Sequence, residues 1–221
     1  MRLANRLVLP LLIAAAFMFA RAPFMIVAAP TEATMGIVQR IFYFHVPSAS
    51  MTFLAAFVCG IASAIYLFRR SPAADRVAVS AAELAVVFGI IVLVTGPLWA
   101  RKSWGVWWQW DPRVTSTLVL WMIYVSYLLL RRFGGAGSEV LSAAVGLLGT
   151  ALVPFVYVSV NYWRTIHPNT NVVPSLPKDM LAPFGWCMLA FFLLFTALLI
   201  VRVRLEASRT ALEEAYVALE D

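Results

Sequence analysis

Residues 80–99 read Ser80-AAELAVVFGIIVLVTGPL-Trp99, a run of twenty residues with one charged side chain, Glu83. A bilayer core about 30 Å thick is crossed by about 20 apolar residues in an α-helix. No alternation of polar and apolar residues typical of a β-barrel is visible, so backbone groups are predicted to pair within helices. Five further apolar blocks flank this run: Leu7–Ala29, Met51–Phe68, Val114–Leu130, Val140–Val160 and Leu181–Val201.

The composition of the whole chain agrees with a membrane protein. Hydrophobic residues make up 62% of the 221 residues and charged residues 13%, whereas soluble domains are roughly half apolar and a quarter charged. A soluble globular enzyme, a disordered tail and a fibrous repeat are therefore excluded. The predicted fold class is an all-α integral membrane protein, a bundle of six transmembrane helices. Residues 1–201 form the predicted membrane domain, and residues 202–221 a cytoplasmic C-terminal tail.

The distribution of basic residues predicts how the bundle is oriented. Of the 17 Lys and Arg residues behind the net charge of +6, ten lie on one side, in residues 1–6, 69–79, 131–139 and 202–221. Six lie on the other side, so the positive-inside rule places both termini in the cytoplasm. Because membrane orientation accounts for the basic residues and no basic-aromatic motif is present, no nucleic acid partner is expected. Three longer connectors then face outward, where function is expected: Pro30–Ser50, Ala100–Arg113 and Asn161–Met180.

The second outer connector is unusually rich in tryptophan. It contains Trp104-Gly-Val-Trp107-Trp108-Gln-Trp110-Asp111-Pro112-Arg113. Trp104, Trp107, Trp108 and Asp111 follow an i, i+3, i+4, i+7 pattern, which on a helix forms one face. That face would be a flat aromatic shelf ending in a carboxylate, which suits a large planar ligand. Basic side chains beside it would meet acidic groups on such a ligand: Arg101, Lys102 and Arg113.

Two structural explanations of this connector stay open. Tryptophan is enriched at membrane interfaces, where its ring anchors helix ends. Asp111-Pro112 is also a favourable helix start, with Asp as N-cap and Pro at the first helical position. Five tryptophans, counting Trp99, exceed what anchoring requires, so a ligand shelf is the favoured interpretation.

The two histidines of the chain, His45 and His167, both fall in predicted outer connectors. Pro168 disfavours helical geometry at His167. Neutral imidazole is a common ligand of zinc and of haem iron. Zinc normally takes three or four protein ligands, and only Asp111 offers a third, whereas haem iron needs at most two axial ligands. Two histidines beside an aromatic shelf therefore favour haem.

These segments resemble a known family. The Trp-rich stretch is similar to the "WWD" signature of the haem-handling proteins of cytochrome c assembly, and Tyr43-Phe-His45-Val-Pro47 is similar to the first histidine segment of that family. Longer members carry more spans, so six spans indicate the haem exporter protein C type (CcmC) of the bacterial Ccm system. The resemblance covers Gln39–Val201.

The resemblance implies a function and a set of partners. His45 and His167 would be axial ligands of the iron of haem b, with Trp104, Trp107, Trp108, Trp110 and Asp111 around the porphyrin and Arg113 near its acidic groups. The family presents haem at the periplasmic face of the inner membrane to the haem chaperone CcmE. The ABC transporter subunits CcmA and CcmB and the small subunit CcmD join the assembly. The chain would be a haem-delivery component, and an enzymatic role in attaching haem to the chaperone stays open.

Two other classes of protein stay open on the residues alone. A membrane b-type electron carrier or quinone-linked subunit would be expected to hold its histidines within spans, not in connectors. A polytopic transporter could use tryptophans to cage a cationic ligand and would need no histidine. A zinc-dependent hydrolase is less favoured because no H-E-x-x-H motif is present.

Two charged residues fall within predicted spans. Arg21 is costly in lipid unless it faces the bundle or reaches the interface. A functional and a structural explanation both stay open, the structural one being that the first helix ends early. Glu83, one turn into the third predicted span, is expected to be stabilised by the helix dipole.

Overall fold

The computed structural model describes residues 2–220. Met1 and Asp221, the ends of the predicted membrane domain and tail, lie outside the described residues, and the side chains of residues 2–5, 214 and 220 are not described. Six helices, each long and apolar enough to cross a membrane, confirm the prediction of an all-α six-span protein. They are α1 (Arg2–Ala28), α2 (Phe42–Arg69), α3 (Pro72–Ser103), α4 (Pro112–Phe133), α5 (Ser138–Tyr162) and α6 (Lys178–Glu220).

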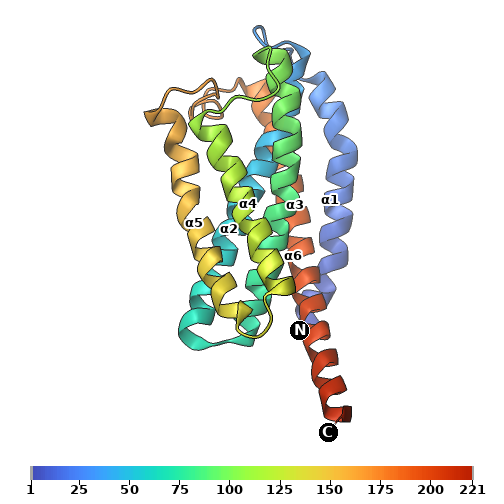
Figure 1. Ribbon diagram of the computed structural model, residues 1–221. Coiled ribbons are helices and arrows are strands. Elements are labelled where there is room, and N and C mark those ends of the chain that lie inside the picture. The colour runs from blue at the N-terminus through green and yellow to red at the C-terminus, as the bar shows by residue number, and fades with distance from the viewer. Residues whose placement is uncertain (1, 221) are drawn as a thin grey trace.

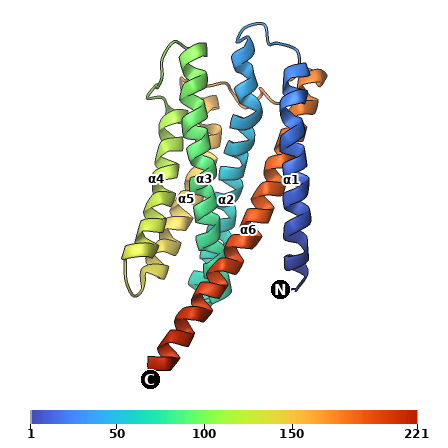
Figure 2. The same cartoon turned by 90° about the vertical axis from the view of Figure 1, so that its right-hand side faces the viewer.

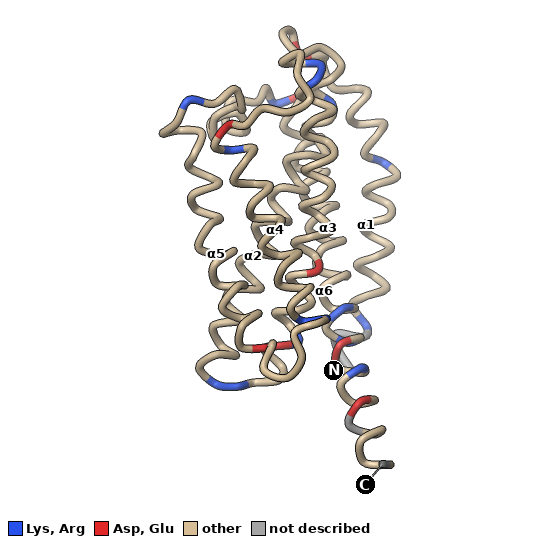
Figure 3. Tube along the Cα trace, in the orientation of Figure 1, with Lys and Arg blue, Asp and Glu red and all other residues tan. Residues whose placement is uncertain are grey.

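The six helices run up and down side by side (Figure 1). The three longer connectors meet at one end of the bundle, and the two short ones lie at the other end, where the termini also lie. Charged residues gather mainly at the two ends and leave the middle largely free of charge, as a bilayer core requires (Figure 3). The end that carries the long connectors is called the outer end below, and its orientation in a cell stays a prediction.

Helix α2 lies at the centre and packs against α3, α5 and α6. Small residues allow this close approach: a Cβ on Gly60 would lie 2.1 Å from Oγ1 of Thr150 on α5. The Thr150 hydroxyl donates to the carbonyl of Ala56 at 2.7 Å. On α5, Gly149 makes room for the ring of Tyr124 from α4. Small residues and polar contacts therefore hold α2, α4 and α5 together, as is common inside lipid.

Ion pairs join helix α3 to α4 and α6 in the half of the bundle away from the long connectors. Arg131 of α4 donates to Asp75 at 2.7 Å, and Arg202 of α6 donates to both carboxylate oxygens of Glu83. The expectation that the helix dipole stabilises Glu83 was wrong. Because α3 begins at Pro72, Glu83 lies about three turns into the helix, beyond the first turn where the dipole acts. Its partner is Arg202.

Helices α6 and α1 both continue past the ends expected from the sequence. Helix α6 has 43 residues, which gives roughly 65 Å at about 1.5 Å per residue. It crosses the bundle obliquely and projects past its inner end without a break at residue 202 (Figure 2). Helix α1 continues through Arg21, which is exposed, and through Pro23. An early helix end at Arg21 is therefore wrong. The long side chain of an exposed arginine can keep its charge at the interface while the helix continues.

The outer connectors are shorter than predicted. They are residues 29–41, which include the 3-10 helix η1 (Ile37–Ile41), residues 104–111 and residues 163–177. Hydropathy detects the apolar core of a span but misses polar residues whose groups bond within the helix. Ser48 and Ser50 donate to the carbonyls of Phe44 and Val46, four residues earlier, at 2.7 and 3.0 Å. The helix can therefore begin well before Met51.

Candidate functional site

Two adjoining cavities lie at the outer end of the bundle. One, about 190 Å³, is enclosed by α2, α3, α4 and the Trp-rich connector. The other, about 490 Å³, lies between η1, α2, α6 and residues 167–174. We call them the tryptophan-side cavity and the α6-side cavity. Residues that line both mark their shared border: His45, Val46, Ser50, Trp99, Arg113, Tyr157 and His167. The structure thus brings together the two histidines, which are 122 residues apart in sequence.

His45 lies in the first turns of α2, not in a connector as predicted. Its Nδ1 lies 2.9 Å from Oγ1 of Thr95 on α3. The Thr95 hydroxyl donates its hydrogen to the carbonyl of Ile91 at 2.7 Å, so its oxygen is left to accept from His45. Nδ1 therefore carries the proton, and Nε2 keeps a free lone pair.

His167 lies in a bend of the third outer connector, as expected from Pro168. Its Nδ1 is 2.9 Å from the carbonyl oxygen of Pro168. A carbonyl only accepts, so Nδ1 is the donor here too and Nε2 is the free nitrogen. The ring of Trp104 packs edge-on against it, with centroids 6.4 Å apart. Both histidines at the cavity border thus offer the same nitrogen as a ligand.

The surroundings of His167 favour its neutral form. The pKa of His167 is lowered from 6.5 to about 4, mainly by burial and also by the positive charge of Arg113. The hydrogen bond to the Pro168 carbonyl opposes this shift in pKa without overcoming it. Only the neutral imidazole has a lone pair for a metal, so His167 is ready to act as a ligand near neutral pH.

Asp111 is buried, with 6% of its surface exposed, and does not line either cavity. One carboxylate oxygen accepts from the backbone N–H of Val114 at 2.8 Å, which confirms that Asp111 is the N-cap of α4. The other accepts from the hydroxyl of Thr165 at 2.5 Å. Thr165 in turn accepts from the N–H of His167 at 3.0 Å. Asp111 therefore connects the start of α4 to the histidine connector.

The Trp-rich connector is not a helix, so the predicted helical face was wrong. Helix α3 ends at Ser103, and Gly105 has a left-handed backbone (φ 78°) that a continuing helix does not allow. The chain must reverse direction within eight residues to start α4 at Pro112. The tryptophans are nevertheless close together, because an irregular loop and the end of α3 bring them to one place.

The structure places the tryptophans in two groups. Trp104, Trp107 and Trp108 line the tryptophan-side cavity together with Trp99, whose ring centroid is 4.8 Å from that of Trp104. Trp110 has 74% of its surface exposed and is not among the lining residues of either cavity. The indole Nε1 of Trp108 is buried without a hydrogen-bond partner among the described residues. It is a donor available to an acceptor inside the cavity.

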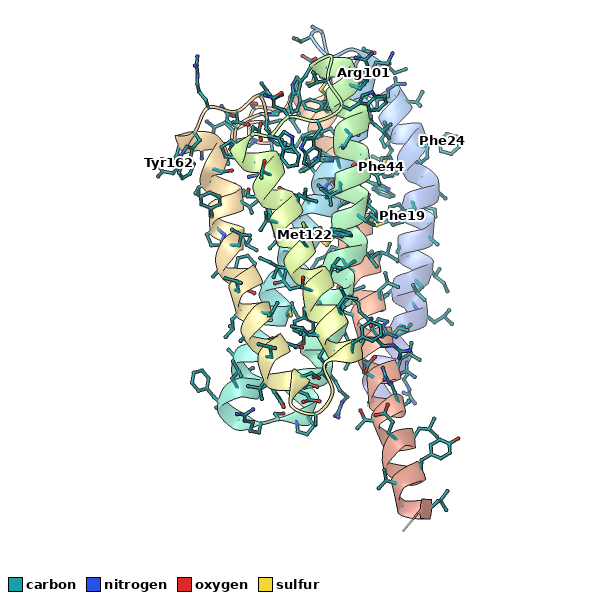
Figure 4. All side chains as sticks on the ribbon, in the orientation of Figure 1. Phe19, Phe24, Phe44, Arg101, Met122 and Tyr162 are labelled. Atoms are coloured by element: carbon teal, nitrogen blue, oxygen red, sulfur yellow. The ribbon has the colours of Figure 1, made fainter. Side chains whose placement is uncertain are left out.

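The three basic residues proposed to meet acidic groups differ in position. The guanidinium of Arg113 lines both cavities, but its Nη1 donates to the carbonyls of Val156 and Tyr157 on α5, at 2.6 and 2.8 Å. Arg101 lies at the exposed outer tip of α3, over the ring of Trp107 at 6.0 Å (Figure 4). Lys102 is exposed and is not among the cavity-lining residues. Only Arg113 is therefore positioned beside both histidines.

The family model of heme exporter protein C, CcmC, matches residues 1–218. The chain belongs to the CcmC family. A heme exporter protein C of Bradyrhizobium diazoefficiens is 35% identical over 82% of this chain and 71% of its own length. The one of Escherichia coli K12 is 33% identical over 80% and 73%. A ccmC-like mitochondrial protein of cytochrome c biosynthesis from Marchantia polymorpha is 31% identical over 80% and 77%.

Three residues around the histidines of this CcmC family member escaped the sequence analysis: Thr95, Gly96 and Thr165. Thr95 and Thr165 bond to His45 and His167, and a Cβ on Gly96 would lie 3.4 Å from Cε1 of His45. A signal for the first two was present, since Thr95-Gly96-Pro97 interrupts the apolar run of residues 80–99. Nothing in the sequence indicated which side chain this interruption would meet.

Proposed function

We propose that this chain binds haem b between His45 and His167 at the periplasmic face of the bacterial inner membrane. It would present the haem to the chaperone CcmE for cytochrome c assembly, together with CcmA, CcmB and CcmD. Membership of the CcmC family supports a role in haem handling for cytochrome c maturation. The observation that carries the ligand assignment is that both histidines border the same cavities and leave Nε2 free.

The donor set at the cavities fits haem better than a protein-bound metal ion. Among the described residues there is no group of three or more His, Cys, Asp or Glu side chains that could hold a metal ion. A porphyrin supplies four ligands itself, so two imidazoles complete the coordination of its iron. Cavities that are mostly apolar and total several hundred Å³ are typical of cofactor sites, which take roughly 300–1,000 Å³.

Residues of the chain have distinct roles in this proposal. Trp99, Trp104 and Trp108 would contact the porphyrin, and Arg113 with the free Nε1 of Trp108 would meet its carboxylates. His45 and His167 would hold the haem iron, and the bound haem would be the group presented to the chaperone. Two imidazole ligands would leave no open site on the iron for oxygen, which suits a carrier.

The position of His45 does not exclude the electron-carrier alternative, because His45 lies in helix α2 and not in a connector as predicted. An electron carrier is expected to hold its histidines within spans, and His45 meets that expectation. The remaining reason against it is that the 221 residues contain only two histidines, enough for one bis-histidine haem and not for the two that electron transfer across a membrane often uses. Family membership also favours delivery over electron transfer.

The test is the absorption spectrum of the detergent-purified protein, oxidised and reduced, beside His45→Ala and His167→Ala. The expected result is a low-spin bis-histidine haem spectrum that each substitution weakens. Co-expression with the chaperone and transporter subunits follows if the isolated protein holds no haem. Unchanged haem in both variants would overturn the ligand assignment and favour the aromatic-cage transporter.

A further inference from the structure

We infer that Thr95 is a positioning residue: its hydroxyl oxygen holds the Nδ1–H of His45 and so directs the Nε2 of His45 toward the cavities. The inference rests on the proposed function, because the role of Nε2 matters only if His45 is an iron ligand. Thr95 itself would bind neither iron nor porphyrin, but it would determine which nitrogen of His45 is available.

The hydrogen bonds of Thr95 have a definite direction. Its Oγ1 donates to the carbonyl of Ile91 at 2.7 Å, and a hydroxyl has one hydrogen to give. The contact of 2.9 Å between Thr95 Oγ1 and His45 Nδ1 must then use the lone pair of the oxygen. A Thr95 hydroxyl facing a deprotonated Nδ1 would have to give up its bond to Ile91.

The contact to an imidazole on another helix distinguishes Thr95 from the other hydroxyl residues described in the helices. Bonding to the carbonyl four residues earlier is ordinary for serine and threonine in membrane helices, and Thr52 and Thr117 do the same at 2.9 and 2.7 Å. Thr95 makes that bond and also reaches the imidazole of a residue 50 positions away. Satisfying its own hydroxyl therefore does not explain its second contact.

The two histidines are held in different ways. His167 donates to the carbonyl of the next residue, Pro168, so its own connector sets the tautomer. His45 is part of α2, and its only described side-chain partner at Nδ1 lies on α3. Gly96, beside Thr95, leaves room at Cε1 of His45. Helix α3 therefore controls the orientation of one ligand, and the third outer connector controls the other.

A bond from Nδ1–H to an acceptor makes the imidazole a stronger ligand, and losing such a partner typically lowers metal affinity about 10- to 100-fold. Loss of the acceptor also raises the reduction potential of the iron, because a less basic imidazole stabilises the oxidised state less. Thr95→Val keeps the shape of the side chain and removes the acceptor. Thr95→Ser keeps the hydroxyl. Thr196→Val is the matched control, since the Thr196 hydroxyl also donates to the carbonyl four residues earlier, that of Phe192, and Thr196 lines neither cavity.

The experiment compares these variants with the parent and with His45→Ala, all purified from membranes of haem-replete cells that also make the partner subunits. Haem per protein and the midpoint potential are measured. We expect Thr95→Val to retain several-fold less haem and to show a more positive potential. Thr95→Ser and Thr196→Val should match the parent. If Thr95→Val does not accumulate, Thr95→Cys, a weaker acceptor, should show a smaller shift in the same direction.

Each result has one interpretation. If His45→Ala loses haem while Thr95→Val keeps the haem content and potential of the parent, the positioning role is overturned and the proposed function stands. If Thr196→Val shifts the potential as much as Thr95→Val, the effect reflects the loss of any helical threonine hydroxyl and the inference also fails. If His45→Ala keeps its full haem content, the proposed function itself fails.

Discussion

The carboxylate of Asp111 and the hydroxyl of Thr165 are joined by a hydrogen bond of 2.5 Å across 54 residues of sequence. The same carboxylate caps α4 through the N–H of Val114. The same threonine accepts from the N–H of His167. A single aspartate therefore fixes where α4 begins and where the histidine connector lies, although it does not line the cavities.

Asp111→Ala should lower both stability and haem retention. Loss of an aspartate N-cap costs about 1 kcal/mol, and the Thr165 hydroxyl loses its acceptor as well. Asp111→Asn should keep the cap but weaken the contact to Thr165, since a neutral amide is a poorer acceptor than a carboxylate. Thermal unfolding and haem content of the purified variants measure the two effects separately.

Ser71→Ala is the matched control for the cap. Ser71 caps α3 at the other end of the bundle by accepting from the N–H of Ala74. Its loss should lower stability without changing haem content. If Ser71→Ala and Asp111→Ala reduce haem equally, the link from Asp111 to the histidine connector has no specific role.

The haem-free protein should lose stability as the pH falls from 6.5 toward 4. The folded pKa of His167 is about 4, below its ordinary value of 6.5, so the unfolded chain binds more protons between these values. Stability from this group is complete above pH 6.5 and declines below it, at most by about 1.4 kcal/mol for each pH unit. Melting temperatures at several pH values test this, and His167→Gln should show a shallower decline. Parallel curves for the two proteins would contradict the assignment.

Trp104→Ala and Trp110→Ala should differ in haem content although both change the Trp-rich connector. Trp104 packs against the ring of His167 and against Trp99 inside the cavity lining. Trp110 is largely exposed and contacts Trp108 at its edge. We expect Trp104→Ala to retain several-fold less haem, and Trp110→Ala to retain nearly as much as the parent. A reversed order would show that the exposed tryptophans hold the porphyrin.

Arg113→Met should destabilise the outer end of the bundle. The guanidinium donates to two carbonyls of α5, and hydrogen bonds of charged groups contribute about 1.5–3 kcal/mol. The control is Arg101→Met, because Arg101 is exposed at the tip of α3 and its described hydrogen bond goes to the carbonyl of Gly105, four residues later. Thermal unfolding should show a lower melting temperature for Arg113→Met alone. Equal melting temperatures would mean that the α4–α5 contact is held by other residues.

Particular elements show where sequence analysis succeeds in this bundle. Six apolar blocks gave six helices, since a bilayer-length run of apolar residues leaves the backbone few alternatives. Asp111-Pro112 was correctly interpreted as a helix start because capping depends on neighbouring residues alone. Residues whose interaction partners are far away in sequence could not be predicted in this way. Glu83 was expected to be stabilised by a helix dipole, and only the fold shows Arg202 beside it.

In the candidate site, too, features set by local sequence were predictable and features set by distant partners were not. The sequence alone placed both histidines and the Trp-rich segment at one end of a bundle of spans, because composition and span counting are enough for that. The tertiary structure decided that His45 belongs to a helix, that the tryptophans come from an irregular loop, and that Thr95 and Pro168 hold Nδ1 of the two rings. The physical reason is that helix formation and lipid burial depend on local residues. The free nitrogen of a histidine instead depends on a hydrogen-bond partner, which for His45 is 50 residues away.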